Sequence, residues 1–219
     1  PTIHNGTAIF GSADGRIYCL DAADGRLVWS FLAAPEDRRI VAYDQVESVW
    51  PVHGSVLVLD DVVQAVVGRS GYLDGGMVLC RLNAQTGRQI SRTPVRDAAL
   101  PDILSSDGTS VYLRHRRFDT RGVEQKTPVP HLYSPAGFLD DTWWHRTYWM
   151  FGTTMRSGWG AWPNSGNQVP AGRLLVLDDA NVYGFGRFNQ YHRNGSHVGM
   201  GQTQYTLYAS PRQAPRSPQ

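Results

Sequence analysis

The sequence of 219 residues is poor in cysteine, with only Cys19 and Cys80. Two cysteines exclude a disulfide-dense scaffold, and there is no CxxC or CxxCH motif that would hold zinc or haem. Both cysteines lie in apolar, strand-like stretches. This setting favours buried free thiols over a disulfide bridge between them.

The chain also lacks a strong charge of either sign. Its formal net charge is +2 and charged residues make up 18% of it, which argues against a nucleic-acid-binding surface. It has no secretory signal pattern and no apolar run of the roughly 18 residues that a membrane span needs. No G-x-S-x-G, Walker or dinucleotide-binding motif is present. Because the sequence begins at Pro1 without an initiator methionine, we expect a piece of a longer protein.

Glycine and proline, in contrast, are abundant, with 23 and 13 residues. They divide the hydrophobic residues, 41% of the chain, into short runs, and no convincing amphipathic helix is present. The sequence therefore predicts an all-β protein with many turns and little helix. Its length suits one or two domains.

One stretch, residues 5–31, shows the organisation most clearly. Asp14-Gly15 is a strong hairpin signal, and Gly25 supplies the positive φ that a second tight turn needs. Trp29 is the large anchor of the last strand. Together these features predict a three-stranded antiparallel meander with strands at 7–10, 16–20 and 26–31.

Residues 13–29, ADGRIYCLDAADGRLVW, resemble the repeat of the pyrroloquinoline-quinone-like (PQQ-like) β-propellers, s-x-D-G-x-l-y-A-l-D-A-x-T-G-K-x-x-W. Asp24 stands where the family usually has Thr, and Arg26 replaces Lys. A second copy at 77–90 restores the Thr-Gly pair but lacks the Trp. The resemblance implies a propeller blade whose turn and Trp serve blade-to-blade packing. It does not by itself imply that quinone is bound.

Weaker self-similarity continues along the chain, since 58–69 aligns with 176–187 and 5–10 aligns with 107–112. We expect polar or irregular connections at 33–45, 119–135 and 157–172. The last stretch, 209–219, is a Pro-rich tail that we expect to be disordered. The remainder predicts about four blades, at roughly 1–32, 46–93, 102–125 and 137–190.

Closed propellers usually have about four to eight blades. About four blades therefore indicate either a small ring or, as we favour, part of a seven- or eight-bladed ring. An open part-ring would expose unpaired blade faces. We expect the missing blades to be supplied by the parent chain or by a protein partner.

The candidate ligand-binding residues are aromatic. The run 138–151 predicts a strand with large side chains on both faces, and Trp159 and Trp162 follow in a Gly/Pro-rich loop. These rings could form a platform for a quinone or a sugar, with Arg146 and His145 as hydrogen-bonding partners. Packing between neighbouring blades is the alternative that we favour for the strand.

We expect no metal site. The Leu-Asp-Asp triplets at 59–61, 139–141 and 177–179 could supply calcium ligands, but each lies at a strand end without a ligand-spaced loop, which favours turns. His192 and His197 flank a turn-like segment and are weak metal candidates. The basic run 114–117 is typical of a protected edge strand, with contact to an acidic partner as the alternative.

Two functions from different classes remain. We favour a non-catalytic PQQ-like β-propeller that acts as a binding or scaffold module for a protein partner. The alternative is part of a quinoprotein dehydrogenase that oxidises alcohols or sugars with PQQ and Ca²⁺. The resemblance implies that such enzymes carry adjacent cysteines, an acidic base and an Asn/Glu/Asp calcium set, and this chain has no Cys–Cys pair. A carbohydrate-binding propeller using Trp159 and Trp162 is a lesser alternative. The resemblance also implies a periplasmic or extracellular location.

Overall fold

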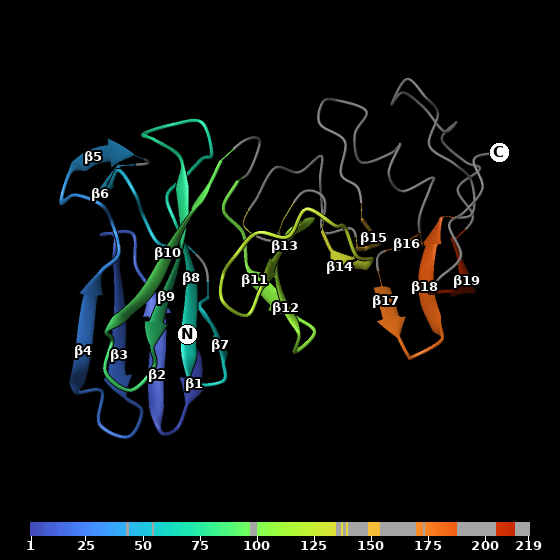
Figure 1. Ribbon diagram of the computed structural model, residues 1–219, viewed down its shortest axis with the longest axis horizontal. Coiled ribbons are helices and arrows are strands. Elements are labelled where there is room, and N and C mark those ends of the chain that lie inside the picture. The colour runs from blue at the N-terminus through green and yellow to red at the C-terminus, as the bar shows by residue number, and fades with distance from the viewer. Residues whose placement is uncertain are drawn as a thin grey trace. The chain divides into compact units, whose positions relative to one another are not determined.

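The computed structural model describes a protein built from antiparallel sheets (Figure 1). Among its described residues there is no helix, so the expected all-β class is confirmed. The described residues are 1–42, 44–53, 55–96, 100–134, 137, 139, 149–153, 170–172, 174–187 and 205–212.

The chain forms two compact units, residues 1–125 and 126–219. The strands of the first unit are β1 (Thr2–His4), β2 (Thr7–Gly11), β3 (Arg16–Asp21), β4 (Leu27–Leu32), β5 (Arg39–Ala42), β6 (Gln45–Ser48), β7 (Leu57–Leu59), β8 (Val62–Val67), β9 (Met77–Asn83), β10 (Gln89–Val95), β11 (Leu104–Ser106), β12 (Ser110–Leu113) and β13 (Arg116–Asp119). Those of the second unit are β14 (His131–Tyr133), β15 (Trp149–Gly152), β16 (Ala171–Gly172), β17 (Leu174–Leu177), β18 (Asn181–Arg187) and β19 (Tyr205–Pro211).

The first sheet is a four-stranded antiparallel meander in the order β1-β2-β3-β4. Strands β2, β3 and β4 follow the three predicted runs closely. The sequence analysis did not predict β1, which joins β2 through Asn5 and Gly6. Both turn residues have positive φ, 45° and 75°, the geometry that a two-residue hairpin favours.

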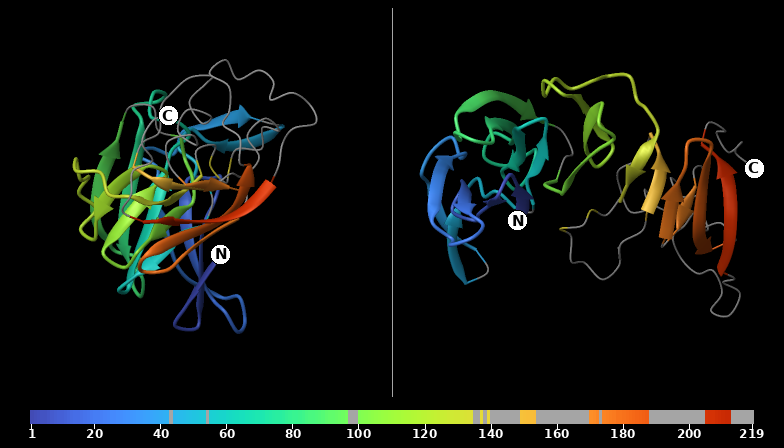
Figure 2. Two further views of the ribbon diagram at one scale, coloured as in Figure 1. Left: turned by 90° about the vertical axis from the view of Figure 1, so that its right-hand side faces the viewer. Right: turned by 90° about the horizontal axis from the view of Figure 1, so that it is seen from below.

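The second sheet, in the order β10-β9-β8-β7, is also four-stranded and antiparallel. One face packs on the first sheet, and the two sheets are neighbours in both views of Figure 2. The shared core contains fully or nearly fully buried side chains of both sheets. Burial of a large aliphatic side chain contributes roughly 1.5–3 kcal/mol to folding stability. They include Ile9, Ile17 and Cys19 from the first sheet and Val63, Ala65 and Leu82 from the second.

The opposite face of the second sheet packs on a third, three-stranded sheet in the order β11-β12-β13. Met77 and Leu79 meet Val111, Leu113 and Phe118 there, and all five are buried. The second sheet is therefore covered by apolar contacts on both faces. This arrangement is expected of a propeller blade between two neighbours.

A hairpin of β5 and β6 lies between the first two sheets in the chain, where the sequence analysis expects a polar connection over 33–45. That expectation is wrong for β5. Ile40 packs on the core, while Val41 and Val46 pair across the hairpin with exposed fractions of 76% and 66%. The alternation of buried and exposed residues is the strand signal, and the surrounding charges masked it.

The described residues of the second unit form two three-stranded sheets, β14-β15-β16 and β17-β18-β19. The interval 137–190 thus includes strands of both sheets. Strand β19 pairs with β18 as far as Pro211, which lies opposite Asn181. The expectation of a disordered tail is therefore wrong for residues 209–211, because β18 offers backbone hydrogen bonds that the tail's composition does not reveal.

Candidate functional site

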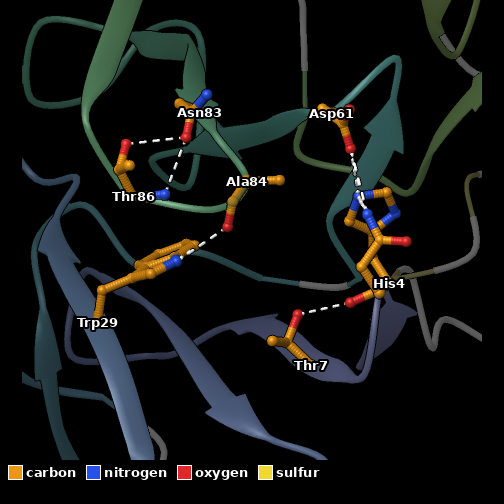
Figure 3. Close-up of polar contacts among 8 residues, drawn as sticks. His4, Thr7, Trp29, Asp61, Asn83, Ala84 and Thr86 are labelled. Carbon is orange, nitrogen blue, oxygen red and sulfur yellow. Dashed lines mark hydrogen bonds and ion pairs between the residues drawn. The ribbon is translucent and has the colours of Figure 1, made fainter.

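The contact between the first two sheets is organised by Trp29. Its indole Nε1 donates a hydrogen bond to the carbonyl oxygen of Ala84 at 2.9 Å, and Figure 3 shows the ring pointing from β4 toward the turn that carries Ala84. The ring lies directly on Gly87, since a Cβ at Gly87 would fall 2.7 Å from Trp29 Cδ2. The resemblance-based expectation that Trp29 and this type of turn pack neighbouring blades is confirmed.

The turn that receives the indole, residues 83–87, is called the Asn83 turn below. The side-chain Oδ1 of Asn83 accepts hydrogen bonds from the backbone N–H and the hydroxyl of Thr86, both at 2.8 Å (Figure 3). The N–H of Gly87 donates to the Asn83 carbonyl at 2.9 Å, and Gly87 has φ 66°, which only glycine adopts readily. The Ala84 N–H donates to the Asp61 carbonyl at 2.9 Å. The receiving surface is therefore rigid backbone.

The first sheet carries an equivalent turn, residues 21–25, called the Asp21 turn below. Here the N–H of Ala22 donates to the carbonyl of Gly6 at 2.8 Å, as Ala84 does to Asp61. Gly25 has φ 75°, and a Cβ placed on it would have no atom within 4 Å among the described residues. The Asp21 turn therefore has the shape of the Asn83 turn but is exposed.

The face of the first sheet beside the Asp21 turn is apolar and only partly covered. Its exposed members are Ile3, at 66%, and Leu27, at 54%. We call this the outer face. It consists of Ile3, Ala8, Phe10, Tyr18, Leu20 and Leu27, which pair with one another across β1 to β4.

The same register in the second sheet gives a buried face. Val58 lies opposite Val63, as Ile3 lies opposite Ala8 in the first sheet. Val63 lies opposite Leu82, as Ala8 lies opposite Leu20. Ala65 lies opposite Cys80, as Phe10 lies opposite Tyr18. Val63, Ala65, Cys80 and Leu82 are each no more than 2% exposed. This is the face on which the sheet carrying Trp29 packs.

The next interface, between the second and third sheets, uses Arg81 instead of a tryptophan. Arg81 Nη1 donates to the carbonyl of Arg121 at 2.8 Å and to Ser91 Oγ at 3.3 Å. A Cβ on Gly122 would lie 2.7 Å from Arg81 Cδ. Burial lowers the pKa of Arg81, partly offset by Asp119. In the second copy of the repeat, Ser91 stands at the position that Trp29 has in the first. The guanidinium of Arg81 thus fills the place of the missing tryptophan.

Tyrosine–aspartate pairs hold three of the hairpin turns. Tyr112 donates its hydroxyl hydrogen to Asp107 Oδ2 at 2.7 Å, and Tyr183 donates to Asp178 at 2.7 Å in the second unit. Tyr18 and Asp14 form a third pair. Burial acts to raise the pKa of Asp107, but the hydrogen bonds that it accepts outweigh this and lower its pKa to about 2. These carboxylates therefore stabilise hairpin turns.

Two of the basic residues at 114–117 form ion pairs inside the first unit. Arg116 contacts both carboxylate oxygens of Glu124, at 2.7 and 2.6 Å. Arg114 lies 3.5 Å from Asp102, and both are buried. They favour the edge-strand interpretation of this run, because their charges are already compensated.

A third ion pair joins the β5–β6 hairpin to the core, with Arg69 Nη2 2.7 Å from Glu47 Oε1. His53 lies within electrostatic range of this pair. Burial lowers the pKa of His53, while the charge of Glu47 acts to raise it. The pair fixes β6, the strand of the hairpin that contains Glu47 and Ser48, because Arg69 also donates to the Ser48 carbonyl at 3.2 Å.

The aspartates of the Leu-Asp-Asp triplets form turns where they are described. Asp60 and Asp61 have positive φ, 50° and 57°, and join β7 to β8. Asp178 Oδ1 accepts the N–H of Ala180 at 2.8 Å and that of Asn181 at 2.6 Å. In the part of the chain that the structure describes, no group of three or more metal-ligating side chains occurs. Cys19 and Cys80 are buried free thiols, as predicted.

The other predicted site residues lie outside the described residues. These are His145, Arg146, Trp159 and Trp162, together with the weaker candidates His192 and His197. Their proposed role as a ligand platform stays a prediction. No helix able to span a membrane occurs in the described ranges.

Sequence reasoning missed Ala84, Gly87 and Arg81 as the residues that join the sheets. The repeat at 77–90 contained a signal for the first two, because it preserves the turn while losing the tryptophan. A turn that is preserved in a repeat without the tryptophan indicates that it contacts a side chain from a strand of another sheet. Arg81 gave no such signal, because an arginine within an apolar strand is not diagnostic.

Two solved structures are similar to this chain in fold. One is a europium-containing methanol dehydrogenase, at 17% identity and TM-score 0.34, where the match covers 54% of this chain and 23% of the other. The other is BamB from Moraxella catarrhalis, at 15% identity and TM-score 0.40, covering 83% of this chain and 53% of the other. This chain spans 23% and 53% of their lengths.

No protein-family model matches the chain, and no curated protein matches it. The sheets themselves have the form of propeller blades, in agreement with the resemblance to the PQQ-like repeat. The two four-stranded meanders and the indole contact between them carry that agreement.

Proposed function

We propose that this chain is a non-catalytic β-propeller module that binds or holds a protein partner. The observation that supports this proposal is the outer face of the first sheet. Ile3 is 66% exposed, whereas the equivalent face of the second sheet, with Val63 and Leu82, is fully covered. Sheets bury an apolar face against another element, and exposed apolar patches mark interaction sites. A partner protein that covers the outer face satisfies this requirement.

Several charged residues of the first unit make structural contacts. Glu47 pairs with Arg69, Glu124 pairs with Arg116, and Asp107 holds a hairpin turn. A binding module needs no cofactor, so the proposal includes none. A periplasmic or extracellular location belongs to the same proposal and follows from the repeat resemblance.

Titration of the purified chain with PQQ and Ca²⁺ tests the non-catalytic part of the proposal. We expect no saturable heat of binding and no quinone absorbance in the purified protein. Saturable PQQ binding that depends on Ca²⁺, with alcohol-dependent reduction of a dye, would overturn the proposal in favour of a quinoprotein dehydrogenase. Oligosaccharide binding that is lost in Trp159→Ala and Trp162→Ala would instead favour a carbohydrate-binding propeller.

A substitution on the outer face tests the binding part. Ile3→Lys places a charge on the outer face, and Val41→Lys places one on the exposed β5–β6 hairpin as a matched control. Complexes isolated from the native source are sized by light scattering. We expect Ile3→Lys to run at the mass of the single chain while Val41→Lys keeps the wild-type mass. Equal masses for wild type and Ile3→Lys would contradict a partner on this face.

A further inference from the structure

We propose that Asn5 is a site of covalent self-modification, at which the backbone nitrogen of Gly6 displaces the side-chain amide and His4 supplies a proton to the departing ammonia. The product is aspartate or isoaspartate at position 5. This chemistry belongs to the hairpin that joins β1 to β2, and it does not depend on a binding partner.

The side-chain amide of Asn5 lies beside an imidazole and a carboxylate. Asn5 Nδ2 is 3.0 Å from His4 Nε2 and donates to Asp61 Oδ1 at 3.4 Å. His4 Nε2 is itself 2.7 Å from Asp61 Oδ1, and Figure 3 shows this pair. Histidine is the most common general acid in proteins, because its ordinary pKa is about 6.5. The nitrogen that must leave Asn5 is therefore within reach of a proton donor whose ring Asp61 orients.

The backbone of the turn can bring the two reacting atoms together. Asn5 and Gly6 have φ of 45° and 75°, which is the type I′ turn of a two-residue hairpin. Ring closure needs a ψ of about −120° at Asn5, where the Gly6 nitrogen eclipses Cβ, and a type II′ turn has this value. The two turn types share a positive φ at the first position and differ by a rotation of the central peptide. Rotation of that peptide therefore allows ring closure while the strands stay in register.

Nothing among the described residues blocks this rotation. Asn5 and Gly6 are both exposed, and a Cβ placed on Gly6 would have no atom within 4 Å. Gly6 tolerates a change of φ from positive to negative because it has no side chain. Its carbonyl keeps the hydrogen bond from the N–H of Ala22, at 2.8 Å, since only the peptide before Gly6 turns.

The equivalent turn of the third sheet lacks this reactivity. It contains Asp107-Gly108, which aligns with Asn5-Gly6. Asp107 Oδ1 accepts the N–H of Ser110 at 2.8 Å, and its pKa of about 2 keeps the group ionised at neutral pH. A carboxylate is a poor target for a nucleophile, whereas the amide of Asn5 is neutral. The same turn therefore has a reactive side chain only in the first sheet.

The reaction needs no reagent other than water. The nitrogen of Gly6 bonds to Cγ of Asn5, and the bond from Cγ to Nδ2 breaks, so that ammonia leaves. The proton lost from the Gly6 nitrogen passes to water, Nδ2 gains its proton from His4 Nε2, and water restores the proton of His4. Water then opens the five-membered imide at either carbonyl carbon, which leaves aspartate or isoaspartate at position 5.

Either product changes the contact between the first two sheets at this end. His4 on β1 reaches Asp61 in the turn between β7 and β8, 57 positions away. A new carboxylate at position 5 repels that of Asp61. Isoaspartate also adds a carbon to the backbone of a turn whose length sets the strand register. We therefore expect the modified chain to be less stable than the unmodified one.

Peptide mapping of the purified chain during incubation at neutral pH tests this assignment. Chromatography with mass spectrometry separates the asparagine, aspartate and isoaspartate forms. Asn194-Gly195, the other Asn-Gly pair of the sequence, is the internal reference in each sample. We expect His4→Gln to lower the rate at Asn5, relative to Asn194, by about tenfold, less than the usual effect of a general acid because water reaches the site. Added imidazole should restore part of the lost rate.

Two aspartate variants test the positioning role of Asp61. Asp60 and Asp61 both have positive φ, 50° and 57°, so Asp60→Ala and Asp61→Ala carry similar backbone strain. Of the two side chains, that of Asp61 contacts His4. We expect Asp61→Ala to slow the conversion of Asn5 several-fold and Asp60→Ala to keep the wild-type rate. Adding Asp61→Ala to His4→Gln should have no further effect, because Asp61 acts through His4.

Three outcomes would overturn the inference. They are an Asn5 that stays unmodified in the folded chain while it converts in urea, equal rates at Asn5 in wild type and His4→Gln, and equal rates in the two aspartate variants. Urea unfolding of each variant confirms that it is folded during the incubation. None of these results bears on the proposed partner, which the Ile3→Lys experiment tests separately.

Discussion

The guanidinium of Arg81 donates to the carbonyl of Arg121 at 2.8 Å, at the position in its interface where the indole of Trp29 meets Ala84 one sheet earlier. In both places a long side chain crosses to a backbone carbonyl in the turn of the next sheet and lies against a glycine, Gly122 or Gly87. One mode of joining sheets is thus realised with two chemically different side chains.

Removing Arg81 should loosen the third sheet. Arg81→Ala deletes a buried stem and leaves the Arg121 carbonyl without its donor, so we expect a loss of about 2–3 kcal/mol in the free energy of unfolding by urea. Arg88→Ala, an exposed arginine seven positions away, is the control and should change stability by less than about 0.5 kcal/mol. Similar values for both variants would show that Arg81 does not join the sheets.

Stepwise truncation of Trp29 should separate the stability that comes from packing of the ring from the stability that comes from its hydrogen bond. Trp29→Phe keeps a ring on Gly87 but loses the N–H that binds Ala84, and should cost about 1 kcal/mol. Trp29→Ala also removes the packed ring and should cost about 3 kcal/mol, near the lower end for aromatic truncation because the side chain is half-buried. Urea unfolding of the two variants measures this, and a melt of Trp29→Ala within a degree of wild type would contradict the contact.

The two equivalent glycines should respond differently to a methyl group in the isolated chain. Gly87→Ala meets the Trp29 ring and should be destabilising by at least about 2 kcal/mol more than Gly25→Ala, which bears only the backbone strain. Adding Trp29→Ala to Gly87→Ala should remove part of this difference, because the clash disappears. Additive losses in the double variant would mean that ring and turn do not touch.

The thiols should be silent in the folded protein. Both thiols are fully buried, and burial raises the pKa of Cys80 to about 11 and also raises that of Cys19, which disfavours the reactive thiolate. An aromatic disulfide reagent should therefore detect no thiol in the native chain and both thiols in urea. Rapid reaction of either cysteine without denaturant would be inconsistent with the core between the first two sheets.

Acid should weaken the third sheet through Asp107. Its folded pKa, about 2, lies below the ordinary value of 3.8, so its contribution is present above pH 4 and is lost as the pH falls toward 2. Because Asp107 is exposed, we expect this contribution to be about 1 kcal/mol or less. Asp107→Asn should reduce the difference between urea unfolding at pH 6 and at pH 2.5. An unchanged difference would show that Asp107 is not the acid-sensitive group.

Part of the fold was readable from a few residues at a time. The meander over 5–31 followed from Asp14-Gly15, from Gly25 and from the alternating strands, because turn φ preferences and strand periodicity are local properties. The β5–β6 hairpin was missed because its charged flanks hid a short alternation. Residues 209–211 were missed because their strand depends on pairing with β18, which no local pattern reports.

The sequence by itself determined that the chain is all-β, where its first strands and turns lie, and that Trp29 is an anchor. Only the tertiary structure decided what the anchor binds, since Trp29 and Ala84 are separated by 55 positions. It also decided that Arg81 joins the sheets at the next interface and that the Asp21 turn, among the described residues, is not covered by a ring. The physical reason is that strand formation needs only neighbouring residues, whereas the covering of a sheet face depends on which other sheet is brought against it in the folded chain.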